Sequence, residues 1–115
     1  MQIYQKLLVI TLSTLVMTSP VQAAEFLADR HAKVGIDCTV CHGPDKSNMQ
    51  VPTIETCTQC HATKALVEKT KDVKPKNPHV SPHYQDQLDC VNCHYGHEAS
   101  QDFCAQCHNF GFKVP

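Results

Sequence analysis

The sequence has few of the side chains from which small proteins usually build a core. It contains no tryptophan and only four phenylalanines among 115 residues. Between positions 24 and 115, valine, isoleucine, leucine and phenylalanine together account for 17 of 92 residues, which is less than an ordinary self-folding domain uses. Chains of this kind need disulfides, a metal or a bound cofactor to stay folded. Something other than apolar side chains must therefore fill the interior.

The sequence also lacks an excess of positive charge and a long apolar run. Ten Lys and Arg residues stand against eleven Asp and Glu residues, a net charge of −1, whereas nucleic-acid-binding domains carry a strong basic excess. The longest apolar run, 7–17, is too short to span a bilayer. We therefore expect no nucleic-acid partner and no membrane anchor, and the length allows one small domain.

The apolar run has the pattern of a cleaved secretion signal. Lys6 precedes it, and small residues follow it at a suitable distance. We place the cleavage after Ala23, with Ala24 as the alternative; a buried N-terminal helix is the competing interpretation. The predicted domains are a signal peptide, 1–23, and an exported domain, 24–115, and the expected location is the periplasm.

All eight cysteines form pairs of one spacing, and a histidine follows each pair. Cys-x-x-Cys-His is the attachment signature of c-type haem, in which the thiols form thioethers to the porphyrin and the histidine binds iron. At this histidine content, four chance matches have a probability on the order of 10⁻⁵. The pattern therefore predicts four covalent haems. The haem-binding cysteines are expected to be Cys38, Cys41, Cys57, Cys60, Cys90, Cys93, Cys104 and Cys107, and the proximal ligands His42, His61, His94 and His108.

Three other interpretations of the cysteines compete with haem attachment. They are a disulfide scaffold, two four-cysteine zinc sites and thioredoxin-like redox motifs. None of these requires a histidine after the second cysteine, and no cysteine is left over. Covalent haem is therefore the interpretation we favour.

Four further histidines match the number of distal iron ligands that four haems need. Met49 is the only methionine outside the signal, so four His/Met sites are impossible. We expect bis-histidine iron at each haem, although a lysine or an open position at one haem stays an alternative. The expected distal ligands are His31, His79, His83 and His97.

The spacing restricts which haem each distal histidine can serve. His94 and His97 are three residues apart, so on a helical turn they would lie on one side and could not straddle one iron. His97 should therefore bind a different haem from the one attached beside His94. His79 and His83 lie in one short segment and should serve two haems. Each distal ligand would then join two haem-bearing segments, and loss of haem should unfold the chain.

The predicted fold is a small multihaem cytochrome in which a few short helices and irregular loops wrap four haems, with little or no β-sheet. The segment between positions 72 and 82 has three prolines and should be extended. A turn is expected at 43–46 and a loop at 47–54. Helices are expected at 24–33, where Gly35 follows the end, at 55–71 and at about 100–108.

Two histidines at each iron would leave no position for a substrate, which points to a one-electron carrier of low potential rather than an enzyme. We find no catalytic residues and no paired carboxylates in a recognisable motif. A multihaem reductase with one open iron is the less favoured alternative. One basic run is either a solvated face or a docking patch for an acidic redox partner; it comprises Lys64, Lys69, Lys71, Lys74 and Lys76.

The sequence resembles the small tetrahaem cytochromes c and the tetrahaem domain of periplasmic fumarate-reductase-type flavocytochromes c. The resemblance covers nearly all of residues 24–115, although the four haem motifs alone would fit many multihaem families. It rests on four segments: Phe26-Leu27-Ala28-Asp29-Arg30-His31, Ser81-Pro82-His83, Cys93-His94-Tyr95-Gly96-His97-Glu98 and Cys107-His108-Asn109-Phe110-Gly111-Phe112.

The resemblance implies that His31, His79, His83 and His97 are distal ligands of the first, second, third and fourth haems, in that order. It also implies a role as the cytochrome subunit or donor of a fumarate-reductase-like flavoprotein, and a free periplasmic electron shuttle is the alternative. The expected partners are a flavin-containing reductase and a membrane-associated, quinol-linked cytochrome donor.

Overall fold

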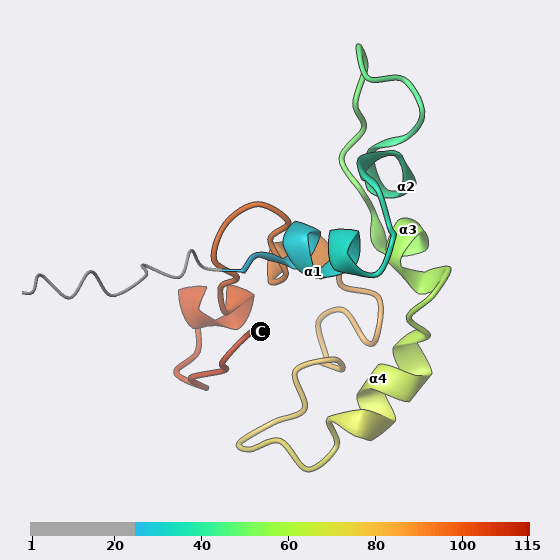
Figure 1. The fold of residues 1–115 in the computed structure, drawn as a ribbon. Helices are drawn as coiled ribbons and strands as arrows, with labels where there is room; N and C mark the ends of the chain where they lie inside the picture. Colours follow the sequence, from blue (N-terminus) through green and yellow to red (C-terminus); the bar gives the residue numbers. More distant parts are fainter. Residues whose placement is uncertain (1–24) are drawn as a thin grey trace, which may run out of the picture.

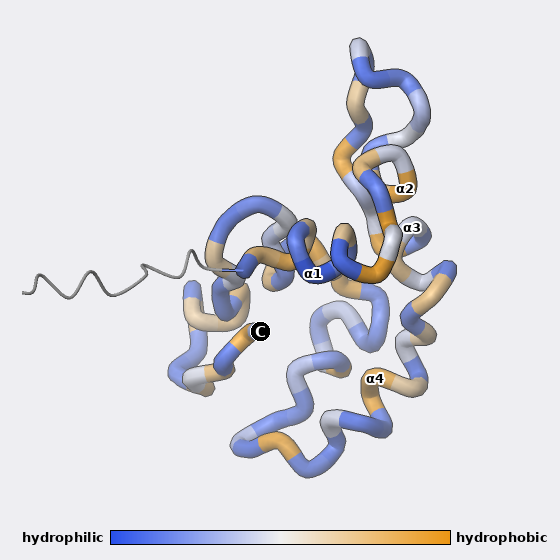
Figure 2. Tube along the Cα trace, in the orientation of Figure 1, coloured by the Kyte–Doolittle hydropathy of each residue, from blue (hydrophilic) through white to orange (hydrophobic). Residues whose placement is uncertain are grey.

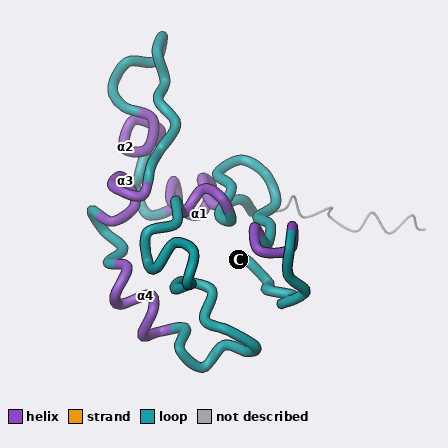
Figure 3. Tube along the Cα trace, turned by 180° about the vertical axis from the view of Figure 1, so that it is seen from behind, coloured by secondary structure: helices purple, strands orange, loops and turns teal. Residues whose placement is uncertain are grey.

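The computed structural model describes residues 25–115, so the predicted signal peptide lies outside the described residues. Within this range, loops join short helices (Figures 1 and 3) and there is no strand beyond an isolated bridge between Ser81 and Gln85. This confirms the predicted fold class. The helices are α1 (Leu27–Lys33), α2 (Cys38–His42), α3 (Ile54–Thr58), α4 (Thr63–Lys69), η1 (Cys90–Asn92) and η2 (Phe103–Gln106).

Residues 25–115 do not bury a single side chain, apolar or polar. Figure 2 shows the apolar residues scattered along the trace instead of gathered in one place. The polypeptide of this region therefore forms no apolar core of its own, as the composition predicts. None of its helices is both long and apolar enough to cross a membrane.

The first helix agrees with its prediction, and the other two predicted helices are wrong in extent. α1 ends at Lys33, and Gly35 follows with a φ of +84°, a conformation that favours glycine. The single helix predicted at 55–71 is divided into α3 and α4, because the chain becomes extended at Ala62 (ψ 125°) directly after the second motif. The helix predicted at about 100–108 is reduced to the four residues of η2.

The proline-rich segment at 72–82 is free of helix, as predicted, but it is turned and bent instead of extended. The Lys74–Pro75 bond is cis. Next along the chain, Ser81 and Gln85 exchange two backbone hydrogen bonds of 3.0 and 2.8 Å. His83 therefore lies in a tight turn that these two residues close.

Hydrogen bonds between distant segments arrange the helices around the motifs. The Ala28 amide at the start of α1 donates to the carbonyl of Gly96 at 2.8 Å. The Ile54 amide, the first of α3, donates to the Asp89 carboxylate at 2.7 Å, and α3 also contacts α2 and η1. The elements that contain the first three motifs are therefore neighbours.

Candidate functional site

Each Cys-x-x-Cys-His motif lies on a single helical turn. The amides of His61, His94 and His108 donate to the carbonyl of the first cysteine of their own motifs at 3.0, 2.8 and 2.8 Å, and the first motif forms α2. Residues three apart on such a turn share a face. Both thiols of a motif can therefore reach one edge of a macrocycle.

The cysteines are not arranged for any of the three competing chemistries. No disulfide joins any two of the eight cysteines. Burial, and secondarily Cys90, raise the pKa of the Cys57 thiol to about 11, and burial raises the pKa of Cys93 and Cys104. A raised pKa disfavours the thiolate form on which redox-active cysteines depend. Among residues 25–115, no three His, Cys, Asp or Glu side chains come together as a zinc site would require.

The histidine rings lie in pairs, each of which joins one motif histidine to one histidine from another segment. The ring centres within a pair are separated by 5.9 to 6.3 Å. The interplanar angles are 85°, 15°, 3° and 34°, respectively, for the pairs His31–His61, His42–His97, His79–His94 and His83–His108.

This separation is the one that two imidazoles have on opposite sides of one metal ion. An imidazole nitrogen lies about 2 Å from a bound metal and about 1.1 Å from its own ring centre, so two rings on one axis have centres about 6.2 Å apart. Among residues 25–115, no three His, Cys, Asp or Glu side chains converge on a common metal position. Paired donors suit a macrocycle that supplies the remaining four ligands, so these residues fit haem.

The observed pairs correct those that the resemblance implies. The resemblance implies that His31, His79 and His83 serve the first, second and third haems, whereas the structure places them beside the second, third and fourth motifs, respectively. His97 lies beside His42 of the first motif. The implied pairings were wrong because a resemblance along the sequence does not determine which segments meet in space. The spacing argument agrees with the structure: His97 does not face His94.

Three histidines have hydrogen-bond partners for Nδ1 that orient their rings. Nδ1 of His31 lies 2.9 Å from the carbonyl of Leu27, and Nδ1 of His42 lies 2.8 Å from that of Gln50. Iron-ligating histidines use such partners to fix the tautomer and the ring orientation. Leu27 lies one turn before His31 on α1, whereas the Gln50 carbonyl reaches His42 only because the loop after α2 folds back on it.

His79 has a different partner, the side chain of Thr70. Its Nδ1 lies 3.0 Å from the Thr70 hydroxyl oxygen, and no motif in the sequence marks this threonine. Burial, and secondarily its neighbour His94, lower the pKa of His79. Burial is also the main cause that lowers the pKa of His94. Both shifts favour the neutral imidazole, the form that binds metals.

The fourth motif is bordered by aromatic side chains from the end of the chain. The Phe110 ring stacks on His108 with centres 4.5 Å apart and an interplanar angle of 7°. Phe112 lies 5.3 Å from Phe110, and its amide donates to the Asp102 carboxylate at 3.1 Å. This segment therefore covers one side of His108.

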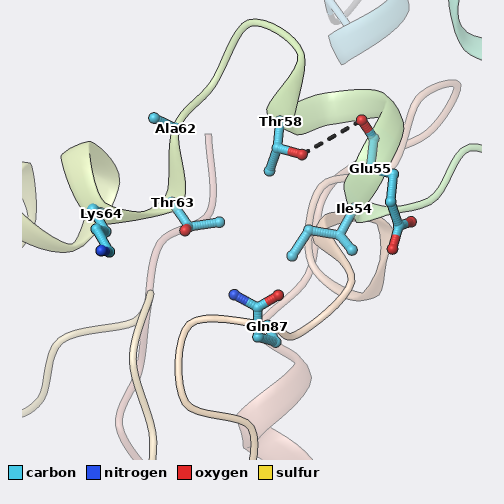
Figure 4. Close-up of a pocket in the computed structure, with 7 residues that line it drawn as sticks. All are labelled: Ile54, Glu55, Thr58, Ala62, Thr63, Lys64 and Gln87. Atoms are coloured by element: carbon cyan, nitrogen blue, oxygen red, sulfur yellow. Dashed lines mark hydrogen bonds between the residues drawn. The ribbon is translucent and has the colours of Figure 1, made fainter.

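A hollow of about 360 Å³ lies beside the second motif, between α3, α4 and the segment that contains Gln87 (Figure 4). In the close-up, Ile54, Thr63 and Gln87 extend toward one another. The hollow borders the second motif, but no histidine or cysteine lines it. We assign it no separate chemistry.

Comparison with known proteins gives these motifs a family. The cytochrome c3 family model matches residues 30–109. The chain belongs to the cytochrome c3 family. This cytochrome is 38% identical over 116 residues to the acrylate reductase cytochrome subunit of Shewanella woodyi, an alignment that covers 97% of this chain and 96% of that protein.

A second relative is much longer than this cytochrome. It is the probable fumarate reductase Ifc3 of Shewanella frigidimarina, 32% identical over 113 residues, which are 94% of this chain and 18% of that protein. The matched portion is thus one part of a larger chain. Membership of the family establishes covalently bound c-type haem and the role of an electron carrier.

Proposed function

We propose that residues 24–115 form a periplasmic tetrahaem cytochrome c of low potential that passes single electrons to a separate flavin-containing reductase. Residues 1–23, with their positive start and apolar stretch, would direct export and be removed. The observation that carries the proposal is the set of four histidine pairs, each with the separation expected across one iron.

The paired histidines would hold the iron and exclude other ligands from it. When bound, haem supplies one-electron exchange between Fe(III) and Fe(II). With two imidazoles from each pair as its protein ligands, the iron would have no position open to oxygen or a small substrate unless a histidine were displaced. Imidazole in place of methionine also favours a low potential. These residues therefore support electron transfer and not substrate reduction.

The arrangement of the motifs supports transfer within the chain. The Cys90 and Cys41 thiols are near enough to Cys57 to raise its pKa. These three cysteines belong to the first, second and third motifs, so the attachment points of three haems would be adjacent. An electron could then cross the molecule in short steps.

The role as a subunit is supported by the relative of similar length. That Shewanella woodyi protein is named as the cytochrome subunit of an acrylate reductase, and the larger relative is named as a probable fumarate reductase. We propose by analogy that this cytochrome feeds a reductase made as another chain, and that a membrane-associated, quinol-linked cytochrome supplies its electrons. A free shuttle is the alternative, and it would show no stable complex with a reductase.

The lysine-rich segment is the surface that we propose for docking to an acidic face of a redox partner. Residues 64–76 contain five lysines and two acidic residues, whereas the rest of 24–115 contains four basic and nine acidic residues. All five lysines are exposed. A local positive surface on a negative molecule would orient encounters with a partner.

The test is a haem count and a ligand-binding assay on the exported protein. We expect four haems per chain by pyridine haemochrome analysis, an intact mass equal to residues 24–115 plus four haems, and no binding of carbon monoxide after reduction. A mass equal to the bare polypeptide would contradict the proposal. Carbon monoxide binding to one haem would favour a multihaem reductase with an open iron.

A further inference from the structure

Thr70 connects the ring of His79 to the end of α4. His31 and His42 face backbone carbonyls through Nδ1, but His79 faces a side-chain hydroxyl at 3.0 Å. If Nε2 of His79 faces the iron, Nδ1 has the proton and donates it to the Thr70 oxygen. A hydroxyl can accept this hydrogen bond and donate another one at the same time.

The Thr70 hydroxyl has two acceptors for its own proton. It lies 2.7 Å from the Leu66 carbonyl and 2.7 Å from Oδ1 of Asn77. One proton serves one of them at a time, and either bond polarises the hydroxyl oxygen toward the imidazole. The result is a relay from the ring N–H through the hydroxyl to an amide oxygen.

Asn77 connects the backbone of His79 to the end of α4. Its Oδ1 accepts the backbone N–H of His79 at 2.9 Å, and its Nδ2 donates to the Val67 carbonyl at 2.8 Å. The last carbonyls of a helix have no partner within the helix, and Asn77 binds one of these in α4, that of Val67. The Thr70 hydroxyl adds a second bond to the Leu66 carbonyl, which also accepts the Thr70 amide at 3.0 Å. The loop that presents His79 is thus fastened to α4 beside the ring.

We propose that Thr70 is a positioning residue that fixes the His79 ring and lowers the reduction potential of the haem held between His79 and His94. The inference rests on the proposed function, because it needs that haem. An acceptor at Nδ1 makes a ligating imidazole more basic, which stabilises Fe(III) relative to Fe(II). Both rings are half-buried, where a hydrogen bond is weakly screened.

The first test replaces the hydroxyl with a methyl group of similar shape. In Thr70→Val, we expect one of the four reduction potentials to rise. At a fixed solution potential, the ratio of reduced to oxidised haem at that site should increase about threefold. This corresponds to a rise of roughly 30 mV, since a tenfold change in the ratio is 59 mV for one electron. Thr70→Ser should retain the wild-type value. Thr53→Val is the matched control, because the Thr53 hydroxyl bonds Glu55 and no histidine. Potentiometric titration followed by NMR would assign each potential to its haem.

Four unchanged potentials in Thr70→Val, or an equal shift of all four, would overturn the proposal. Should that variant fail to assemble, the wild-type protein provides the second measurement. In the reduced protein labelled with 15N-histidine, the His79 Nδ1–H should exchange slowly with solvent and show a nuclear Overhauser effect to the Thr70 side chain. Rapid exchange without that effect would contradict it. Four low-spin haems in the wild type, counted first, distinguish failure of this inference from failure of the proposed function.

Discussion

At the scale of single residues, the angle between the two histidine rings of a pair can be tested by electron paramagnetic resonance spectroscopy. The His31 and His61 planes are nearly perpendicular at 85°, whereas His79 and His94 are nearly parallel at 3°. Perpendicular axial imidazoles leave two iron d orbitals nearly equal in energy, and parallel imidazoles split them. The two geometries give different electron paramagnetic resonance spectra.

We predict one strongly anisotropic low-spin signal among the four ferric haems. His31→Ala should remove that signal alone and open one reduced haem to carbon monoxide, because His31 would be the distal ligand beside His61. His97→Ala, which affects a pair at 15°, is the control and should leave the anisotropic signal intact. Four indistinguishable rhombic signals would contradict the assignment.

The histidines that are candidate iron ligands could be identified from the sequence, but which of them lie opposite one another could not. The motif histidines follow from a local spacing, and the four remaining histidines follow from a count. Whether His31 faces His42 or His61 depends on contacts between segments, such as the bond from Ala28 to Gly96. Thr70 could not be found because its partner His79 lies nine residues away across an irregular loop.

At the scale of elements, distant side chains stabilise helices that are too short to form alone. Thr53 precedes α3 but provides no side-chain cap; instead the Asp89 carboxylate, 35 residues away, accepts the first amide of that helix. This bond joins the second motif to the third. The division of the predicted 55–71 helix also arises here, because the second motif ends its own turn before α4 begins.

Removal of this long-range cap should destabilise the holoprotein. For Asp89→Ala we expect a loss of about 1–3 kcal/mol in the free energy of unfolding, since a charged acceptor of a backbone amide is lost. Chemical denaturation followed by circular dichroism measures it. Asp72→Ala, at an exposed position, is the control. An equal loss in both variants would contradict the capping role.

The N-terminus of α2 should make stability depend on pH. The Asp37 carboxylate accepts hydrogen bonds from the Thr39 side chain and amide, and these lower its pKa, the side-chain bond most. Since the pKa is lower in the folded state, the stabilisation is present above the ordinary pKa of about 3.9. It is lost as the pH falls through the folded value.

The variant Asp37→Asn retains an acceptor at this cap but does not titrate. Between about pH 5 and pH 3 its melting temperature should therefore fall less steeply than that of the wild type. Differential scanning calorimetry across this range measures the difference. Parallel curves would show that Asp37 does not contribute to acid sensitivity.

At the scale of the whole molecule, charge is unevenly distributed. The lysine-rich segment comprises α4 and the loop after it, which lie at one extremity of the ribbon (Figure 1). The rest of residues 24–115 has an acidic excess. The rate at which a charged redox agent reacts with the protein should therefore depend on the position of a neutralised lysine as well as on the net charge.

Two triple variants with the same net charge test this distribution. Neutralising Lys69, Lys74 and Lys76 to Gln should slow reduction by the anionic iron(II)–EDTA complex about two- to tenfold at low ionic strength. The matched variant changes Lys33, Lys46 and Lys113 to Gln and should slow it less. Stopped-flow kinetics measures both, and the difference should vanish at high salt. Equal slowing would contradict a localised docking surface.

The absence of a buried side chain in residues 25–115 is the whole-molecule feature that the composition predicted best. The low aliphatic content predicts that the interior is not filled by apolar side chains, and the Cys-x-x-Cys-His motifs predict that haem fills it. The path of the loops could not be predicted, because the groups that organise them are histidines at irregular intervals and not a periodic apolar pattern.

A high-resolution crystal structure of the exported, haem-loaded protein tests the central claim most directly. An iron whose two axial ligands come from any other combination, or that has a histidine on one side alone, would contradict the account. The account predicts one iron midway between the rings of each of the pairs His31–His61, His42–His97, His79–His94 and His83–His108.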